Sequence, residues 1–178
     1  MNNLLRLAAG LLLTLAPLLA TAETLRGMPL LRRYGPEDYN ASPQQLGIAV
    51  DREGRLYVGN NEGVLRYEGN KWELTTLPGK QSGRGVVLGQ DGRIYVGSYD
   101  SFGVLKATAD GEVAYEDLLT ADGLKGTDRN VGRVWTGVTT DEGVYFRAEH
   151  ALHFLRCDRT RSGHWRNFAT AIRMSTSS

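Results

Sequence analysis

Short apolar stretches separated by glycine, asparagine and aspartate dominate the pattern of this chain of 178 residues. Hairpin turns favour these residue types, so each apolar stretch is expected to be a strand. The first four strands are expected at 46–50, 55–59, 64–67 and 71–74. Residues 46–50 are apolar without alternation, which predicts a strand buried on both faces. Together the four strands predict one antiparallel meander.

The second strand and the turn before it recur along the chain. The segment Asp51-Arg-Glu-Gly-Arg-Leu-Tyr-Val-Gly59 returns as Asp91-Gly-Arg-Ile-Tyr-Val-Gly97, with its tyrosine 38 residues later. A third, degraded copy reads Asp141-Glu-Gly-Val-Tyr-Phe146. Internal periods of this size are typical of solenoids, propellers and arrays. The chain is therefore expected to consist of a few copies of one small β unit.

The later units repeat the order of the first, and no segment shows a sustained helical period. Their strands are expected at 85–88, 93–96, 104–106 and 112–115, and then at 134–138, 144–147, 151–155 and 164–168. A lone four-stranded sheet cannot bury both faces, so the units must stack. The fold class predicted is all-β, a partial β-propeller of about three four-stranded antiparallel blades. A flat sandwich is the alternative, but sandwiches rarely keep a near-identical hairpin at constant spacing.

The amino terminus has the three parts of a secretory signal peptide, predicted at residues 1–22. Arg6 is the basic part, residues 7–19 are apolar, and Ala20-Thr21-Ala22 is a small-residue cleavage site. An uncleaved anchor is the alternative, although the apolar run is shorter than the ~20 residues that span a bilayer. Periplasmic localisation follows, with no membrane span after cleavage.

The alternation of predicted turns and strands divides the rest of the chain. A lead-in segment is expected at 23–43, an incomplete propeller at 44–168 with units at about 44–78, 84–118 and 133–168, and a disordered tail at 169–178. Propellers close with about four to eight blades, and these units provide about three. The sequence after Leu155 becomes arginine-rich and no longer alternates between turn residues and short apolar stretches. We interpret this as a cut or shifted reading frame of a longer propeller; a native polar tail is the alternative.

Charge and cysteine content limit the classes of partner. Without residues 1–22 the chain has 20 basic and 20 acidic residues, because Arg6 is the only charged residue removed. A neutral chain lacks the basic patch or stripe of nucleic-acid binding proteins, so no nucleic-acid partner is predicted. Cys157 is the only cysteine, which excludes an intramolecular disulfide and supports no metal or redox role.

Three sets of polar or aromatic residues were candidates for chemistry, and none predicts a catalytic, cofactor or metal site. Residues three apart on a strand point to opposite faces, so His150 and His153, with Glu149 and His164 nearby, are expected to be solvated or packed. The carboxylates recur at the same turn of each unit, which indicates turn formation rather than a glycosidase pair. They are Asp51, Glu53, Asp91, Asp141 and Glu142. The recurrent aromatics, expected to pack between blades, are Tyr57, Tyr95, Tyr145 and Trp72.

Ligand-binding residues are not assigned from the sequence, but one region is favoured. The loops that enter the inner strands, near Gln45, Arg84 and Arg133, are expected to ring a central channel, and two arginines there suit an anionic ligand. Trp135 follows a long loop and is expected in the core or at the channel mouth. The segment Gly123-Leu-Lys-Gly126 lacks the spacing and the following helix of a phosphate loop.

The repeated phrase Asp-x-x-Gly-Arg-(Leu/Ile)-Tyr-Val-Gly, followed by Gly63-Val-Leu-Arg-Tyr67 or Gly103-Val-Leu-Lys106, resembles the two-component regulator propeller repeat. The lead-in around Arg33-Tyr-Gly-Pro-Glu-Asp-Tyr39 is similar to the entry of the first blade in that family. The resemblance covers about residues 32–155, and Phe146-Arg147 departs from it in the third unit. It implies an exported propeller that binds a ligand in bacterial membrane sensors whose output is a histidine kinase, a diguanylate cyclase or a DNA-binding domain.

Three hypotheses follow. The first is a ligand-sensing propeller fragment of a two-component-type signal-transduction sensor, without its own transmembrane or output domain, that recognises a small molecule or glycan and is not an enzyme. The second is a fragment of a propeller enzyme that acts on polysaccharide. The third is an interaction protein that self-associates through open blade faces. No cofactor is predicted for any of them.

Overall fold

The computed structural model describes residues 31–121, 131–159 and 165–172. The chain separates into residues 1–33 and residues 34–178, and all described strands and helices belong to the second unit. The predicted signal peptide, residues 123–126 and His164 lie outside the described residues. No helix in the described part of the chain is both long and apolar enough to cross a membrane.

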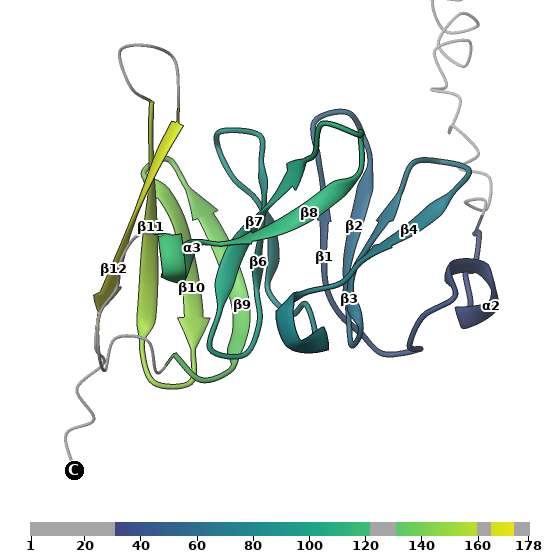
Figure 1. Cartoon of the computed structure of the whole chain (residues 1–178), viewed down its shortest axis with the longest axis horizontal. Coiled ribbons are helices and arrows are strands. Elements are labelled where there is room, and N and C mark those ends of the chain that lie inside the picture. The colour runs from purple at the N-terminus through teal and green to yellow at the C-terminus, as the bar shows by residue number, and fades with distance from the viewer. Residues whose placement is uncertain (1–30, 122–130, 160–164, 173–178) are drawn as a thin grey trace, which may run out of the picture. The chain divides into compact units, whose positions relative to one another are not determined.

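The described residues contain twelve strands in three four-stranded antiparallel sheets, and each sheet is a meander in chain order (Figure 1). The first sheet contains β1 (Gln45–Val50), β2 (Leu56–Asn60), β3 (Gly63–Tyr67) and β4 (Trp72–Thr75). The second contains β5 (Val86–Leu88), β6 (Ile94–Gly97), β7 (Phe102–Ala107) and β8 (Val113–Asp117). The third contains β9 (Val134–Thr140), β10 (Gly143–Ala148), β11 (Leu152–Arg159) and β12 (Trp165–Ile172). The predicted fold, an all-β partial propeller of three four-stranded blades, is confirmed.

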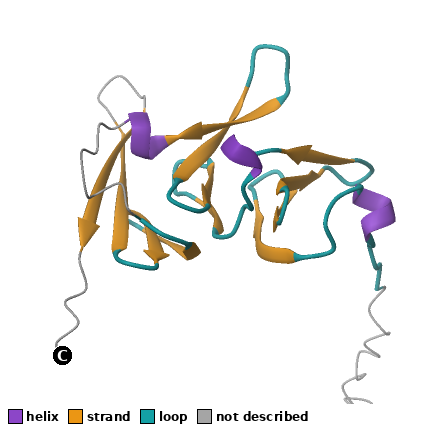
Figure 2. Ribbon diagram, turned by 60° about the horizontal axis from the view of Figure 1, so that its bottom comes forward, coloured by secondary structure: helices purple, strands orange, loops and turns teal. Residues whose placement is uncertain are grey.

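Single helical turns occur in the lead-in and in the connections between sheets (Figure 2). They are α2 (Pro36–Tyr39), the 3-10 turn η2 (Pro78–Lys80) and α3 (Leu118–Ala121). The turn α2 begins with a proline at its first position, and the Asp38 carboxylate accepts a hydrogen bond from the Gly35 N–H at 2.7 Å. It ends at Tyr39 and is followed by the capping residue Asn40, which adopts a left-handed conformation. The turns η2 and α3 therefore lie between blades, and α2 precedes the first blade.

Two hydrophobic clusters join the three sheets in series. We call the face that a sheet turns to the preceding sheet its front face, and the face turned to the following sheet its rear face. Between the first and second sheets lie Tyr57 and Val64 of the first and Val86, Ile94, Val96 and Leu105 of the second. Between the second and third lie Tyr95, Phe102 and Val104 of the second and Val134, Val144, Phe146 and Leu155 of the third. Apolar burial between stacked blades therefore holds the fold together.

A glycine at or next to the end of the second strand of the first and second sheets permits the next blade to approach closely. A β-carbon at Gly59 would lie 2.6 Å from the Gly83 carbonyl oxygen, on the segment that enters the second sheet. A β-carbon at Gly97 would collide with the side chain of Val134, at the start of the third sheet. Both positions therefore require glycine because the next blade begins against them.

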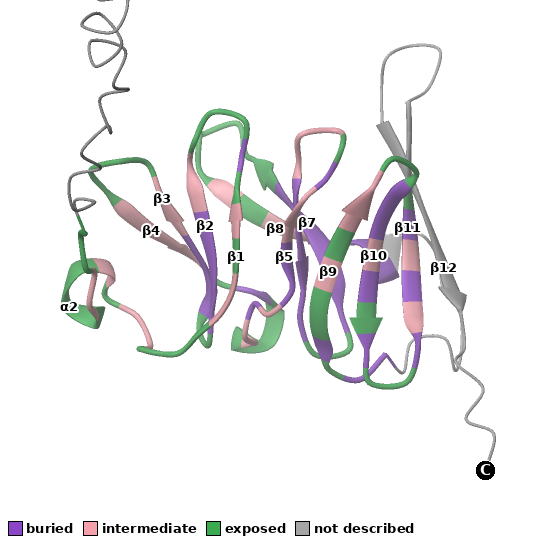
Figure 3. Cartoon of the chain, turned by 180° about the vertical axis from the view of Figure 1, so that it is seen from behind, coloured by how far each residue is buried: buried purple, intermediate pink, exposed green. Residues whose placement is uncertain are grey.

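The prediction that residues 46–50 are buried on both faces is wrong. In β1, Ile48 is 68% exposed and Val50 is 52% exposed, and the pairing register places both on the front face of the first sheet. Figure 3 shows exposed stretches along β1. The first sheet has a following sheet but no preceding sheet among the described residues. Its inner strand is therefore covered on the rear face only, and an unbroken apolar run does not reveal which face is left open.

The expected packing of Trp72 between blades is also wrong, because the lead-in takes that place. The Trp72 ring lies 5.3 Å from the Tyr34 ring and 5.7 Å from the Tyr39 ring, measured between centroids. Tyr34 also donates a hydrogen bond from its hydroxyl to that of Tyr67 at 2.8 Å. The lead-in thus covers the outer strands of the first sheet's front face, and α2 lies beside β4 (Figure 3).

The last strand continues beyond the boundary expected at residue 168. Strand β12 ends at Ile172, because β11 is long enough to pair with it from Leu152↔Ile172 to Arg159↔Trp165. The first four residues of the expected tail, 169–172, therefore belong to the third sheet. The remaining tail residues lie outside the described part of the chain.

Candidate functional site

The aspartates at the recurrent turns hold their own turns. The Asp51 carboxylate accepts hydrogen bonds from the backbone N–H groups of Glu53 and Arg55, at 3.1 and 2.8 Å. It also accepts from Arg55 Nε at 2.6 Å and from the Tyr57 hydroxyl at 3.2 Å. Asp51, Arg55 and Tyr57 together therefore fix the first turn to the second strand. This agrees with the prediction that the recurrent aspartates form turns.

The second sheet repeats this arrangement. Asp91 accepts from the backbone N–H of Arg93 at 3.0 Å, from Arg93 Nε at 2.7 Å and from the Tyr95 hydroxyl at 2.6 Å. In the third sheet Asp141 and Glu142 are exposed at the β9–β10 turn, where Gly143 stands in the place of the arginine. The carboxylates are spread over three turns, and those of Asp51 and Asp91 are occupied by hydrogen bonds within their own turns.

The electrostatics of the first turn agree with a structural role. Burial raises the pKa of Asp51, but the hydrogen bonds and charge of Arg55 outweigh this effect and leave it below its ordinary value. Burial also raises the pKa of Tyr57, with the adjacent Asp51 carboxylate adding to the increase. The aspartate is therefore ionised and the tyrosine protonated, which is the pairing that the hydrogen bond between them needs.

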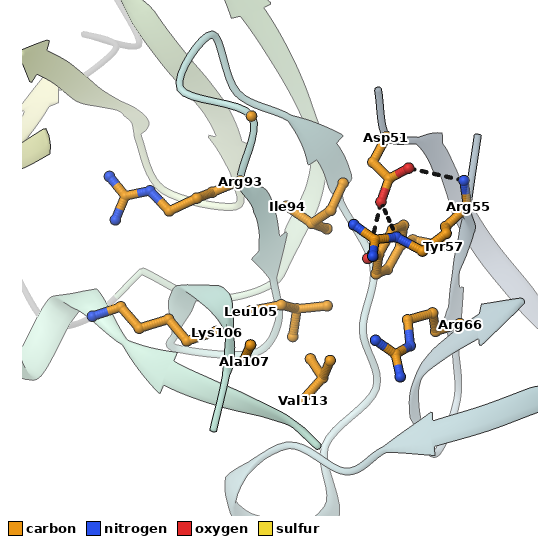
Figure 4. Close-up of a pocket in the computed structure, with 11 residues that line it drawn as sticks. Asp51, Arg55, Tyr57, Arg66, Arg93, Ile94, Leu105, Lys106, Ala107 and Val113 are labelled. Carbon is orange, nitrogen blue, oxygen red and sulfur yellow. Dashed lines mark hydrogen bonds and ion pairs between the residues drawn. The ribbon is translucent and has the colours of Figure 1, made fainter. Parts of the chain in front are cut away.

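A cavity of about 160 Å³ lies between the first and second sheets beside these turns (Figure 4). Its lining has apolar residues, Ile94, Leu105 and Val113 among them, and four basic side chains. Each basic side chain has an acidic partner: Arg55 pairs with Asp51, Arg66 with Glu73, Arg93 with Asp91 and Lys106 with Glu116. The basic charges around the cavity are thus already paired within their own sheets, which leaves the described lining of this cavity without free charge for a ligand.

A second candidate site, after the cavity, lies where the chain enters the second and third sheets. We call it the strand-entry cluster, and it consists of Arg84, Tyr99, Arg133 and Trp135. The Arg84 guanidinium carbon lies 5.5 Å from the centroid of the Trp135 ring, and that of Arg133 lies 5.8 Å from it. Trp135 is 41% exposed and Tyr99 is 50% exposed. Two cations from different sheets therefore meet one accessible indole, a geometry that favours cation–π attraction.

Backbone pairing positions this cluster. The Arg84 N–H donates to the Gly97 carbonyl at 2.8 Å, which ties the entry of the second sheet to the end of β6. Arg133 forms an antiparallel bridge with Tyr99, so the entry of the third sheet runs beside the β6–β7 turn. The Val134 N–H donates to the Ser98 carbonyl at 2.9 Å. The cluster is therefore built on the frame of two adjacent blades.

Buried polar side chains fix the entry segments in the same way in the first two sheets. Asn60 donates from Nδ2 to the Ser42 carbonyl at 2.6 Å, and Ser98 Oγ lies 2.9 Å from the Ser82 carbonyl. Asn60 also donates to the Gln45 side chain at 3.2 Å. Gln45, expected beside Arg84 and Arg133, thus supports the entry of the first sheet through Asn60, whereas the two arginines meet at Trp135.

Tyr99 is the member of the cluster that the sequence reasoning missed. It follows Tyr-Val-Gly-Ser in the second repeat, so it begins the turn after the second strand. The structure places this turn against the entry of the next blade. An exposed aromatic at that turn was a usable signal, because blades are entered at the same end where their second strands finish.

Neither described histidine is a member of the cluster, although His150 lies beside Gly132 at the entry of the third sheet. His153 is buried in β11 and its ring lies 5.5 Å from that of Phe102, while His150 is exposed in the preceding turn. Among the described residues, no three histidine, cysteine, aspartate or glutamate side chains come together as a metal site would require. Packing thus accounts for His153.

No protein-family model, curated protein or solved structure matches this chain. The function is therefore argued from the strand-entry cluster and the fold that presents it.

Proposed function

We propose that this chain is the ligand-recognising propeller segment of an exported, two-component-type sensor. The observation that supports this role is the strand-entry cluster, in which an accessible tryptophan lies between arginines from two blades. Residues at blade entries surround the channel of a propeller, where a ligand can touch several blades at once. A ligand bound there would couple the second and third sheets.

The proposed ligand is an acidic small molecule or an acidic glycan. Guanidinium groups form strong, directional hydrogen bonds with carboxylates, and an exposed indole offers a flat apolar surface to a sugar ring. Tyr99 adds a second exposed aromatic ring at the edge of the same cluster. Cationic and aromatic groups together suit a ligand with a negative charge on a compact ring.

A binding role is proposed rather than a catalytic one because of how the acidic side chains are used. Asp51 and Asp91 are saturated by hydrogen bonds within their own turns. General acid or base chemistry needs a carboxyl group that reaches the substrate, and these two do not face the strand-entry cluster across a cleft. The recurring phrase that ends in Tyr-Val-Gly adds the resemblance to sensor propellers, and residues 1–22 support export.

The test is calorimetric titration of the protein with digalacturonate, succinate and inorganic phosphate as acidic probes and cellobiose as a neutral probe. We expect an acidic probe to bind, and we expect Arg84→Ala and Arg133→Ala each to raise its Kd at least tenfold, since a charged hydrogen bond contributes about 1.5–3 kcal/mol. Arg156→Ala is the matched control, because Arg156 is exposed at the opposite end of the third sheet.

Trp135→Phe gives a second readout. It should remove the change in tryptophan fluorescence that binding causes, while retaining most of the affinity. Failure of all three acidic probes to bind, or an equal loss of affinity in Arg84→Ala and Arg156→Ala, would contradict the proposed site.

A further inference from the structure

On their two inner strands, the front faces of the first and second sheets carry apolar residues at the same four positions. The pairings Ile48↔Val58 and Val50↔Leu56 match Val86↔Val96 and Leu88↔Ile94. The equivalent positions are therefore Ile48 and Val86, Val50 and Leu88, Leu56 and Ile94, and Val58 and Val96. In the second sheet Val86, Ile94 and Val96 are buried against the first sheet. The first sheet thus presents a packing face to which no described sheet corresponds.

The rear face of the third sheet is likewise not covered by any described sheet. Tyr145 pairs with Val138, just as Tyr95 pairs with Val87 and Tyr57 with Ala49 on the two rear faces that are packed. Val138 is 59% exposed, and Tyr145 stacks on Phe154 with 4.5 Å between ring centroids. The third sheet therefore keeps the tyrosine and the aliphatic neighbour that its two predecessors pack against the next blade.

We propose that a second copy of this chain covers both faces. The rear face of the third sheet of one copy packs on the front face of the first sheet of the other, and the reverse contact forms at the same time. Two copies then close one ring of six sheets, within the range of about four to eight blades that propellers use. A head-to-tail contact that closes in this way gives a discrete dimer instead of a filament.

The location of the exposed apolar residues supports this pairing. Ile48 and Val50 lie on β1 and Val138 lies on β9, and these are the innermost strands of the two terminal sheets. The innermost strands also make the close contacts inside the chain, since a β-carbon at Gly85 of the second sheet would lie 2.9 Å from the Thr136 backbone on β9. The lead-in covers Tyr67 and Trp72 on the outer strands, so it leaves the inner strand β1 free for a partner.

Two side chains make the joint between copies different from the joints inside the chain. Thr136 and Arg147 pair with each other in the third sheet and stand where the first sheet has Gly47 and Gly59. Both glycines meet the backbone of the next blade closely. The intermolecular joint is therefore wider at the entry end and is closed by Val138 and Tyr145. The variant Thr136→Gly/Arg147→Gly should tighten it.

The test is the mass of the chain in solution, measured by sedimentation equilibrium. We expect a dimer, and we expect Ile48→Asp and Val138→Asp each to raise its dissociation constant at least tenfold, because each buries a charge in one half of the same joint. Ala114→Asp is the control, as it places the same charge at an exposed position on β8. Thr136→Gly/Arg147→Gly should lower the dissociation constant. Far-UV circular dichroism establishes that every variant keeps its strands.

Each alternative assembly predicts a different result. A symmetric contact between two first sheets would respond to Ile48→Asp but not to Val138→Asp, and that pattern would overturn the proposal. A monomer at all concentrations, or a series of masses that continues beyond the dimer, would overturn it as well. The outcome is independent of the ligand experiment, because Arg84 and Trp135 are changed in none of these variants.

Discussion

Asp51 shows how one side chain can fix both a turn and a strand. Its carboxylate is buried and accepts hydrogen bonds from two backbone N–H groups, one guanidinium and one phenol. An asparagine has the same size but only one acceptor oxygen, so it cannot accept all four. The aspartates of the first two repeats therefore hold their turns by the same chemistry, which explains why the sequence repeats them.

We expect Asp51→Asn to lower the free energy of unfolding by about 1–3 kcal/mol, since it leaves a charged hydrogen bond from Arg55 unmade in a buried place. Urea denaturation at neutral pH measures the change. Asp141→Asn is the matched control, because Asp141 occupies the equivalent turn of the third sheet but is exposed. A loss of similar size in both variants would show that the hydrogen bonds of Asp51 have no special weight.

The carboxylate of Glu73 gives a prediction on pH. Hydrogen bonds from Lys71 and Arg66 lower its pKa from 4.5 to about 2. A lowered pKa means that the pairing stabilises the fold fully above pH 4.5 and that this contribution is lost as the pH falls toward 2. The stability difference between the wild type and Glu73→Gln should therefore be constant above about pH 6 and shrink below pH 4.5. Glu62→Gln, at an exposed turn, should show no such change.

At the scale of elements, the turns made the strands predictable. Every expected strand exists, with ends that differ mostly by one or two residues, because the Gly, Asn and Asp turns and the alternation in segments such as 55–59 are local signals. What the sequence did not reveal depends on neighbours. The open face of β1, the lead-in packed on Trp72, and the place of Tyr99 beside Arg133 all arise from contacts between segments far apart in the chain. The position of Arg84 and Arg133 at the strand entries could be predicted, because the repeat fixes where each sheet begins.

The glycine at the end of the second strand allows a matched test across the three sheets. We expect Gly59→Ala to destabilise the protein by about 1–3 kcal/mol, because the new methyl group would meet the Gly83 backbone oxygen, which cannot move aside easily. Gly97→Ala should cost a similar amount, because the new methyl group would lie 2.8 Å from Cβ and still closer to Cγ1 of Val134, a buried β-branched side chain that cannot rotate away easily. Arg147→Ala, at the equivalent position of the third sheet, should be nearly neutral. Thermal unfolding of the three variants measures these effects, and an equal effect at all three positions would contradict the prediction.

At the scale of the whole molecule, the sheets behave as a series in which each contacts its neighbours only. The second sheet is packed on both faces, and its Tyr95, Val96 and Val104 are fully buried. The first and third sheets each have one packed face, so their inner strands keep exposed apolar residues. Stability in such arrays is approximately a sum over sheets and the joints between neighbours. Closing the two outer faces would therefore add joints of a kind that the chain already contains.

This additivity leads to a prediction on thermal unfolding. If two chains close one ring, mass action stabilises the folded dimer, and the Tm of the wild type should rise with protein concentration. The Tm of Val138→Asp should not depend on concentration, and it should equal the Tm of the wild type at the lowest concentration. Val138 is exposed in the single chain, so its replacement removes only the contact between the two chains. Calorimetry over a hundredfold range of concentration measures both. A wild-type Tm that does not change over this range would show that the inner strands β1 and β9 stay uncovered, and that the chain is stable with only the two joints it forms internally.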